Sequence, residues 1–514
     1  RYTIRQLNSA SSCFFSFFCV IYFIYKISDM KEVITRMAPS PTNRMLHIGN
    51  LRTLLFNYLF AKKNNGKFLV RLEDTDRDRY TPEFLTHFQE TLEWFGTEVD
   101  GSYWKPDDNI GSFVQSERDY TTHVKYLLDN GYAYYAFDTK EQLEVLRNNK
   151  LKYDRNTRYN MCNSFTLSKE EVQQKIAEGD YVIRFAIFDS YDVSFNDSVY
   201  GDITINTDNL DDKVLIKSNG IGSYHLCNVC DDHDMNISHV MRGEEWINST
   251  PFHILLYRAF GWDVPQFVHL PNVLTPDGKK LSKRTSRKYG IPISPLGYVD
   301  KDTNEFIKGF REEGYEPQAL LNYLVFLGWA PNDNTEIMSM SEMIDRFSLD
   351  RVHRAGAKMD MDKLKWFNHN YIMNVLPDDY LNSKININGA FDDEKKKMIL
   401  EMAKDRSTFT SEMQSIVDLF DKDVMLNSDL LSKVTIDAKT VFGLLLGEMQ
   451  IINWDKDVIK SKIEEISTGI NVKPGKIMSS LRIALTGGVP GPDLYSTMII
   501  LGRDETIRRI SNVI

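Results

Sequence analysis

Two short segments carry side chains suited to holding a chain of phosphates. The first is His47-Ile48-Gly49-Asn50, which lies between an expected strand and the helix that follows it. Backbone amides at a helix N-terminus attract anions, Gly49 lets an anion approach the backbone, and His47 can donate a hydrogen bond. Taken alone, however, a histidine close to a glycine is commonplace, and an ordinary helix start is the more frequent explanation.

The second segment is Lys280-Leu281-Ser282-Lys283-Arg284. Several cations on one loop can clamp a polyphosphate, although a basic loop alone is more often a solvated turn. The sequence has neither a Walker phosphate loop nor a well-placed G-x-G-x-x-G. The two segments together, with the first placed between a strand and a helix, therefore indicate a nucleotide site of another kind.

The elements that must position these segments form two units of strand, helix and strand. The first has strands at 33–37 and 68–72 around a helix that ends at Asn64-Asn65-Gly66. The second has strands at 238–242 and 266–270 around a helix that Ser249 or Thr250 caps and Gly261 ends. Such units predict a parallel sheet.

More than a hundred residues separate the two units. They include an expected helix at 140–150 and strands at 181–187 and 202–206, and we interpret them as a domain inserted into the nucleotide-binding sheet. From about residue 376 the strand signals largely vanish. Helices are then predicted at 395–402, 409–420, 438–452 and 458–466.

The length of 514 residues suggests several domains. Lys and Arg number 62 against 72 Asp and Glu, for a net charge of -10. This balance argues weakly against a nucleic-acid partner but does not exclude one, because local clusters hold a phosphate backbone. Residues 1–29 have a basic start and a short apolar run. Our first interpretation is translated sequence upstream of Met30, and our second is a targeting segment.

Cys227 and Cys230 form a C-x2-C motif with His225 and His233 nearby. This is half of a possible zinc site, but structural zinc needs four ligands and no second cysteine pair exists. The favoured interpretation is two small buried residues on a helix.

The segment at 47–50 resembles the His-Ile-Gly-His signature, and the segment at 280–284 the Lys-Met-Ser-Lys-Ser signature, of class I aminoacyl-tRNA synthetases. The surrounding blocks, at 36–42, 71–76, 239–246 and 366–369, resemble those of bacterial-type glutamyl-tRNA synthetases, and the resemblance covers essentially all of 30–514. It implies an α/β fold: a Rossmann-type parallel-sheet catalytic domain with an inserted acceptor-binding domain, then a stem-contact region and an all-α C-terminal anticodon-binding region.

On this resemblance we expect six segments. They are the extension at 1–29, the first catalytic half at 30–112, the inserted domain at 113–222, the second catalytic half at 223–278, the basic loop with the stem-contact domain at 279–372, and the helical domain at 373–514.

The resemblance also assigns the substrates and their contacts. Glutamate would meet Arg36, Ala38, Ser40, Glu73, Tyr224, Asn228 and Arg242. The chemistry agrees, because glutamate offers two carboxylates and one ammonium: the Arg36 and Arg242 guanidinium groups suit a carboxylate and Glu73 suits the ammonium. Tyr224 and Asn228 are four apart, so a helix would place them on one face.

ATP would meet His47, Gly49, Glu245, Trp246, Val273, Lys280, Leu281, Ser282, Lys283 and Arg284. The catalytic residues would be His47 and Lys283, which stabilise the transition state and do not act as a general base. Magnesium is expected with ATP, without a protein ligand, and no zinc is expected. The partners implied are tRNA(Glu), ATP and L-glutamate. The protein is expected to be a monomer and not to bind a membrane. Its expected compartment is the cytoplasm, or a mitochondrion or plastid if the N-terminal extension is real.

The sequence departs from the family pattern in two places. The loop at 43–46 is one residue longer than usual and lacks a glycine, and Asn50 is unusual. Where some relatives bind zinc through a Cys-x-Cys pair, this chain has Ala136-Phe137-Asp138.

Four competing interpretations stay open. A glutaminyl-tRNA synthetase would need a β-barrel tail, and a short paralogue that modifies a tRNA base would lack the C-terminal helices. A non-discriminating enzyme would also charge tRNA(Gln). An inactive tRNA-binding relative is disfavoured by the intact Arg36, Glu73, Arg242 and Lys283.

Overall fold

The computed structural model describes residues 32–107 and 109–514, so the extension expected at 1–29 lies outside the described residues. The chain divides into two compact units. The first contains the described residues up to Phe310 together with Leu324–Met359, and the second contains Arg311–Tyr323 and Asp360–Ile514. The finer boundaries proposed from the sequence stay predictions.

The first unit begins with the expected strand, helix and strand: β1 (Ile34–Met37), α2 (Ile48–Lys63) and β2 (Lys67–Val70). β1 and β2 are parallel, with Ile34 opposite Lys67. The turn between α2 and β2 needs its glycine, because a Cβ on Gly66 would lie 1.9 Å from the carbonyl oxygen of Val33. A short strand, β3 (Gly101–Ser102), pairs with the other edge of β2.

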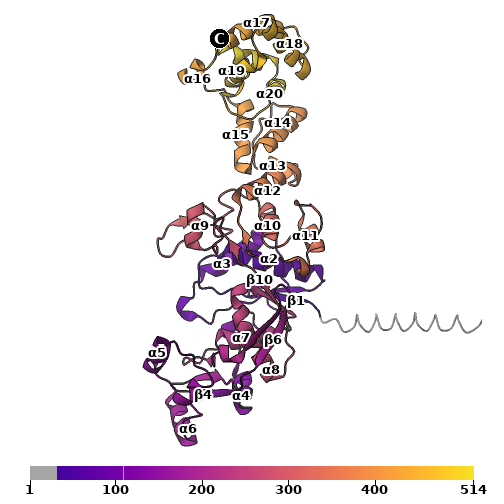
Figure 1. Cartoon of the computed structure of the whole chain (residues 1–514). Helices are drawn as coiled ribbons and strands as arrows, with labels where there is room; N and C mark the ends of the chain where they lie inside the picture. Colours follow the sequence, from indigo (N-terminus) through magenta and orange to yellow (C-terminus); the bar gives the residue numbers. More distant parts are fainter. Residues whose placement is uncertain (1–31, 108) are drawn as a thin grey trace, which may run out of the picture. The chain divides into compact units, whose positions relative to one another are not determined.

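The second unit of this kind is β9 (His239–Gly243), α8 (Thr250–Phe260) and β10 (Gln266–Leu270), again with parallel strands. Ser238 connects the two βαβ units. Its hydroxyl accepts from the Ile34 amide at 2.8 Å, and its own backbone amide donates to the Ile34 carbonyl at 3.0 Å. β1 and β9 therefore lie close together, so the two sheets, β1-β2-β3 and β7-β6-β10-β9, are neighbours (Figure 1 labels β1 and β10).

The region between the two units differs in one respect from the expectation. The strand predicted at 202–206 is β7 (Gly201–Asn206), which forms a hairpin with β6 (Asp192–Asp197), and β6 pairs with β10. This hairpin therefore extends the catalytic sheet, in the order β7-β6-β10-β9, and is not part of a separate sheet. The Asp197 carboxylate fixes the join by accepting from the His269 amide at 3.1 Å.

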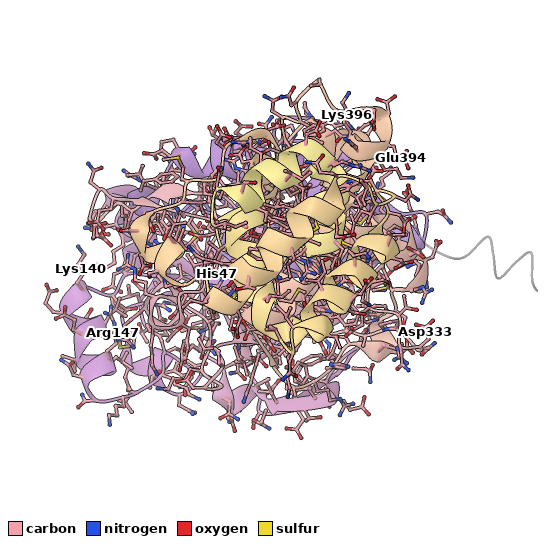
Figure 2. The ribbon with its side chains drawn as sticks, turned by 90° about the horizontal axis from the view of Figure 1, so that it is seen from above. His47, Lys140, Arg147, Asp333, Glu394 and Lys396 are labelled. Atoms are coloured by element: carbon pink, nitrogen blue, oxygen red, sulfur yellow. The ribbon has the colours of Figure 1, made fainter. Side chains whose placement is uncertain are left out.

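The rest of the inserted region has its own three-stranded sheet. The strand predicted at 181–187 is β5 (Val182–Phe185), which pairs antiparallel with β4 (Ala133–Ala136) and β8 (Val214–Ile216). The helix predicted at 140–150 is α5 (Lys140–Asn148), and α6 (Lys169–Glu178) follows it. Figure 2 labels Lys140 and Arg147 on α5, where both side chains are exposed.

A hydrogen-bonded brace is built on Asp138, in the stretch Ala136-Phe137-Asp138 that was compared with a Cys-x-Cys pair. The Asp138 carboxylate accepts from the Cys162 amide at 2.7 Å and from the Tyr153 hydroxyl at 2.6 Å. Ala136 and Phe137 offer no ligand atom, and the Asp138 oxygens already have partners, so these residues do not fit a zinc ion. The brace joins three segments of the inserted region.

Replacing Asp138 by alanine should destabilise the first unit by about 2 kcal/mol, because it leaves two polar hydrogens without an acceptor. The temperature of thermal unfolding should fall by several degrees. Asp138→Asn, which keeps one acceptor oxygen, is the matched control and should lose less. If Asp138→Ala melts at the wild-type temperature, the brace contributes nothing.

The second unit consists of helices. Two apolar cores lie in it, one centred on Ile399 and Val417 and one on Phe442 and Leu481. The main helices are α12 (Met361–Asn374), α14 (Asp393–Arg406), α15 (Thr410–Asp421), α17 (Ile436–Met449), α18 (Lys456–Gly469), α19 (Pro474–Thr486), α20 (Leu494–Leu501) and α21 (Arg503–Ser511). Figure 1 shows α17, α18 and α19 grouped in yellow. The predicted helical tail is confirmed.

The described part of the chain contains no helix that is long and apolar enough to span a membrane.

Candidate active site

A cavity of about 590 Å³ opens where β1, β9 and β10 end. Its walls include all seven residues expected to meet glutamate: Arg36, Ala38, Ser40, Glu73, Tyr224, Asn228 and Arg242. They also include seven of those expected to meet ATP: His47, Gly49, Glu245, Trp246, Val273, Lys280 and Leu281. Ser282, Lys283 and Arg284 do not belong to its lining. The two separate βαβ units therefore build one site.

Arg242 is a buried cation in the wall of this cavity. It lies on β9 and is 6% exposed. Its Nη1 donates to the Tyr224 hydroxyl at 3.2 Å and its Nε to His269 Nε2 at 3.1 Å. No described carboxylate is bonded to it directly, which leaves its charge available to an anion in the cavity.

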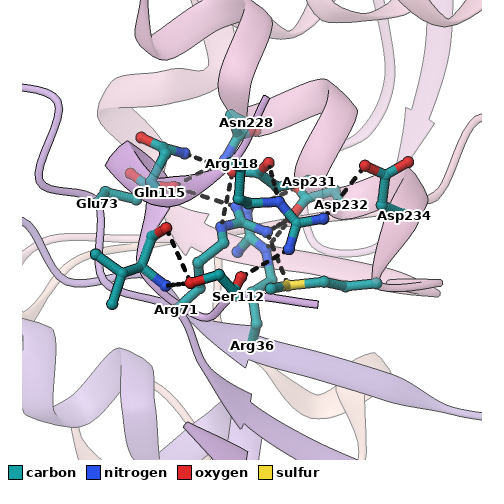
Figure 3. A network of polar contacts seen from close by, with 12 residues as sticks. Arg36, Arg71, Glu73, Ser112, Gln115, Arg118, Asn228, Asp231, Asp232 and Asp234 are labelled. Carbon is teal, nitrogen blue, oxygen red and sulfur yellow. Dashed lines mark hydrogen bonds and ion pairs between the residues drawn. The ribbon is translucent and has the colours of Figure 1, made fainter. Parts of the chain in front are cut away.

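Arg36, the second arginine expected at the substrate, already has a carboxylate partner. Its Nε and Nη2 donate to the two oxygens of Asp232 at 3.0 and 3.1 Å. Arg71 also donates to Asp232, at 2.7 Å, so one carboxylate holds two buried guanidinium groups (Figure 3). Burial by itself would raise the pKa of Asp232, but the positive charges of Arg36 and Arg71 outweigh it and hold this pKa below the ordinary value. Arg36 thus meets a ligand as a neutralised cation, unlike Arg242.

Asp232 and Arg71 were not among the residues predicted for the site. A signal was present, because Tyr224, Asn228 and Asp232 recur four apart along α7 (Tyr224–Asp234) and lie on one face of that helix. Both missed residues are buried, with Arg71 at 0% and Asp232 at 1% exposure.

Glu73 is the acidic group of the cavity wall. It is 9% exposed and accepts from Arg71 at 3.2 Å and from the Asn228 amide at 3.3 Å. Burial raises the pKa of Glu73, and the positive charges of Arg71 and Arg36 oppose that rise. Bringing an ammonium group beside it adds a further favourable partner.

His47 also lines the cavity and is neutral. Its Nδ1 accepts from the Gly49 amide at 2.9 Å, which places the ring hydrogen on Nε2. Burial, followed by the charge of Lys280, lowers the pKa of His47 to about 4. The ring is therefore a hydrogen-bond donor at neutral pH and not a general base.

The amides at the start of α2 do not face an anion as the sequence suggested. The Ile48 amide donates to the Ile293 carbonyl at 2.9 Å, and the Asn50 and Leu51 amides donate to the His47 carbonyl at 2.9 and 3.0 Å. With Gly49 bonded to the ring of His47, all four amides have partners. The groups near this helix start that can meet phosphates are nearby lysines and the His47 ring, which also interacts with the Leu281 backbone.

The unusual loop at 43–46, before His47, ends in two buried residues. Met45 and Leu46 are 4% and 1% exposed, and the Leu46 amide donates to His87 Nδ1 at 3.3 Å. The end of the loop therefore packs into the protein, and His47 lies in the cavity wall.

The basic segment is partly strand-like and partly helical. The Leu281 amide donates to the Val273 carbonyl at 2.9 Å, and Lys280 Nζ lies 3.6 Å from Glu245 Oε1. Ser282 then caps α9 (Lys283–Tyr289), so Lys283 is the first residue of a helix. Its Nζ lies 5.4 Å from the centre of the Tyr298 ring, outside the cavity lining.

Cys227 and Cys230 are buried thiols on α7, which confirms the favoured interpretation of this pair. Burial raises the pKa of both. His233 stacks on Trp262 with 3.7 Å between ring centres, and His225 hydrogen-bonds to His253 at 3.1 Å. No group of metal-binding side chains occurs among the described residues.

The comparison with known families agrees with this geometry. Residues 32–366 match the class I tRNA synthetases (E and Q), catalytic domain, and residues 362–514 match the anticodon binding domain. The parallel sheet, the cavity at its carboxyl edge and the basic segment beside it are thus those of a class I aminoacyl-tRNA synthetase.

Individual relatives narrow the family. The glutamate–tRNA ligases of Porphyromonas gingivalis and Flavobacterium psychrophilum are each 40% identical, over 94% of this chain and 99% of the relative. A crystal structure of a glutamate tRNA ligase from Elizabethkingia meningosepticum in complex with its amino acid is 39% identical, with a TM-score of 0.85 over 94% of this chain and 99% of that one. The chain belongs to the bacterial-type glutamyl-tRNA synthetase family.

Proposed function

We propose that the cavity binds L-glutamate and ATP together, and that the chain attaches the glutamate to tRNA(Glu) through a glutamyl-adenylate. The observation that carries this proposal is the shared cavity: its lining includes Arg242 and Glu73, suited to a carboxylate and an ammonium, together with His47 and Lys280, suited to phosphates. The charges of these groups match those of glutamate and of a triphosphate.

The first step needs positioning more than proton transfer. An oxygen of the glutamate α-carboxylate attacks the α-phosphorus of ATP, a new P–O bond forms, and the bond to the β-phosphate breaks to release pyrophosphate. Arg242 and Glu73 fix the amino acid, while the His47 Nε2 hydrogen and the lysines stabilise charge on the phosphates. The low pKa of His47 suits this role, because the ring donates without adding or removing a proton.

In the second step a terminal ribose hydroxyl of the tRNA attacks the activated carbonyl, and AMP leaves. A second cavity of about 860 Å³ supports an approach of the tRNA end from the inserted region. It shares Thr75 and Gln115 with the first cavity and extends to Tyr135 on β4 of the inserted region. We propose that the helical unit contacts the anticodon.

Three further parts of the proposal rest on the resemblance. Magnesium enters as part of the ATP complex, without an assigned protein ligand. The chain acts as a monomer, and its compartment is the cytoplasm.

Pyrophosphate exchange tests the function directly. Labelled pyrophosphate should enter ATP when the chain is given glutamate and tRNA(Glu), because adenylate formation is reversible. Glutamine in place of glutamate should give little exchange. Absence of exchange with glutamate, both with and without tRNA, would contradict the proposal and favour a tRNA-binding protein without activity. Charging assays on purified tRNA(Glu) and tRNA(Gln) would then measure how far the enzyme discriminates.

A further inference from the structure

The side of Arg242 that faces away from the cavity is held by three buried residues. Its Nη2 donates to Thr250 Oγ1 at 2.8 Å, its Nη1 lies 3.3 Å from His253 Nδ1, and its Nε donates to His269 Nε2 at 3.1 Å. These three partners are at most 1% exposed, and none of them belongs to the cavity lining. They fix the guanidinium from behind.

The other two contacts of Arg242 lie on the cavity side. Nη1 donates to the Tyr224 hydroxyl at 3.2 Å, and Nη2 lies 3.4 Å from the Trp246 carbonyl oxygen. Tyr224 and Trp246 both line the cavity. A guanidinium has five N–H groups, so a carboxylate arriving in the cavity would replace these two contacts and receive one hydrogen each from Nη1 and Nη2.

The hydrogen positions on the two histidines follow from the arginine. Because a guanidinium only donates, both imidazole nitrogens that face it are acceptors, and both rings are neutral. The hydrogen of His269 is then on Nδ1, which lies 2.7 Å from Asp197 Oδ2, and that of His253 is on Nε2, which lies 3.1 Å from His225 Nδ1. Burial and the charge of Arg242 lower the pKa of His253, in keeping with a neutral ring.

This arrangement is the opposite of the one around Arg36. Arg36 and Arg71 both donate to the Asp232 carboxylate, and Arg71 is also paired with Glu73 and Asp231, so these acids together balance the two positive charges. All five hydrogen-bond partners of Arg242 are uncharged, and Asp197 is connected to it only through the ring of His269. A buried cation satisfied only by neutral acceptors keeps an unbalanced charge, which an anion relieves and a neutral amide does not.

We propose that Thr250, His253 and His269 determine specificity as positioning residues: they hold Arg242 without neutralising it, and so make the cavity select the anionic side chain of glutamate over the neutral amide of glutamine. This inference rests on the proposed function. It differs from the assignment of Arg242 itself, because it places the choice between acid and amide in residues that do not touch the substrate.

Thr250 offers a matched pair of variants. It is the first residue of α8, where the helix dipole favours an acidic side chain. Thr250→Asp puts a carboxylate beside Arg242, and Thr250→Asn puts a neutral acceptor of the same shape there. The measurement is kcat/KM for glutamate and for glutamine in pyrophosphate exchange with tRNA(Glu).

The aspartate variant should lose about a hundredfold in kcat/KM for glutamate and much less for glutamine, because a carboxylate at this distance competes with the substrate for the same charge. The asparagine variant should keep the wild-type ratio of the two substrates to within about threefold. Equal ratios in the two variants would overturn the proposal.

A second pair decides the matter if Thr250→Asp does not fold, which thermal unfolding would reveal. His269→Gln keeps an acceptor near the position of Nε2, whereas His269→Leu leaves the buried Nε–H of Arg242 without one. The His269→Leu variant should raise KM for glutamate about tenfold or more while KM for ATP is unchanged. The His269→Gln variant should bring KM for glutamate much of the way back to the wild-type value. Equal KM values for glutamate in the two variants would contradict the inference.

These outcomes are distinct from a failure of the proposed function. That failure would show in the wild-type chain, as absence of exchange with glutamate, before any variant is compared.

Discussion

Replacing Arg242 by alanine should abolish glutamate charging while tRNA binding stays close to the wild-type level. The variant removes the buried charge that faces the cavity and leaves the acceptors Thr250 and His253 without their donor. Truncating one partner of a buried, hydrogen-bonded charge pair costs about 4 kcal/mol, which is about a thousandfold in kcat/KM for glutamate. The measurements are the charging rate of tRNA(Glu) and a separate titration of tRNA binding.

Arg242→Lys is the matched control. Lysine keeps the positive charge but has no planar fork, so it cannot donate to Thr250, His269 and a carboxylate together. We expect it to recover part of the activity and to remain far below the wild type. Charging by Arg242→Ala at near wild-type efficiency would show that the glutamate site has been misplaced, whatever the behaviour of the lysine variant.

The elements that carry the site were predictable because their signals are local. The turn at Asn64-Asn65-Gly66 ends α2 where expected, and Pro251 and Gly261 mark the two ends of α8. The spacing of Tyr224 and Asn228 placed both on one helical face, and both line the cavity. Each of these inferences needed only residues within a few positions of one another.

The features that were missed depend on residues distant in sequence. Asp232 on a helix reads as an ordinary solvated acid until Arg36, 196 positions away, is brought against it. The helix-tip amides of α2 were assigned to an anion because nothing near them predicts that the Ile293 carbonyl takes the first. The strand at 202–206 shows an alternation that is the same in any sheet, and only the pairing of β6 with β10 decides which sheet it joins.

Arg36 shows the limit of assigning a role from residue type. An arginine in this position suits a carboxylate ligand, and the structure places it in the cavity wall. The same guanidinium is held by Asp232, however, so its contribution to binding is that of a group whose charge is already balanced. Type and spacing predict that a side chain reaches the site, but the balance of charge around it is set by tertiary packing.

Lys283→Ala should lower kcat by two to three orders of magnitude, since removing one donor that stabilises charge in the transition state costs about 3 to 4 kcal/mol. In the structure, Lys283 begins the short helix α9 and its Nζ lies over the Tyr298 ring. Its charge is nonetheless close enough to lower the pKa of His47, together with burial and Lys280. Because Lys283 is outside the cavity lining, we expect the basic segment to shift when ATP binds and to bring this amine onto the phosphates.

The control for Lys283 is its neighbour on the same turn, Arg284→Ala, which removes an equal charge from α9 without removing the amine of Lys283. We expect Arg284→Ala to change kcat much less than Lys283→Ala and both variants to keep the wild-type KM for glutamate, because neither side chain reaches Arg242 or Glu73. Single-turnover formation of glutamyl-adenylate, in the presence of tRNA(Glu), isolates the step concerned. A Lys283→Ala enzyme that forms the adenylate at the wild-type rate would mean that His47 and Lys280 suffice to hold the phosphates and that α9 stays where the structure has it.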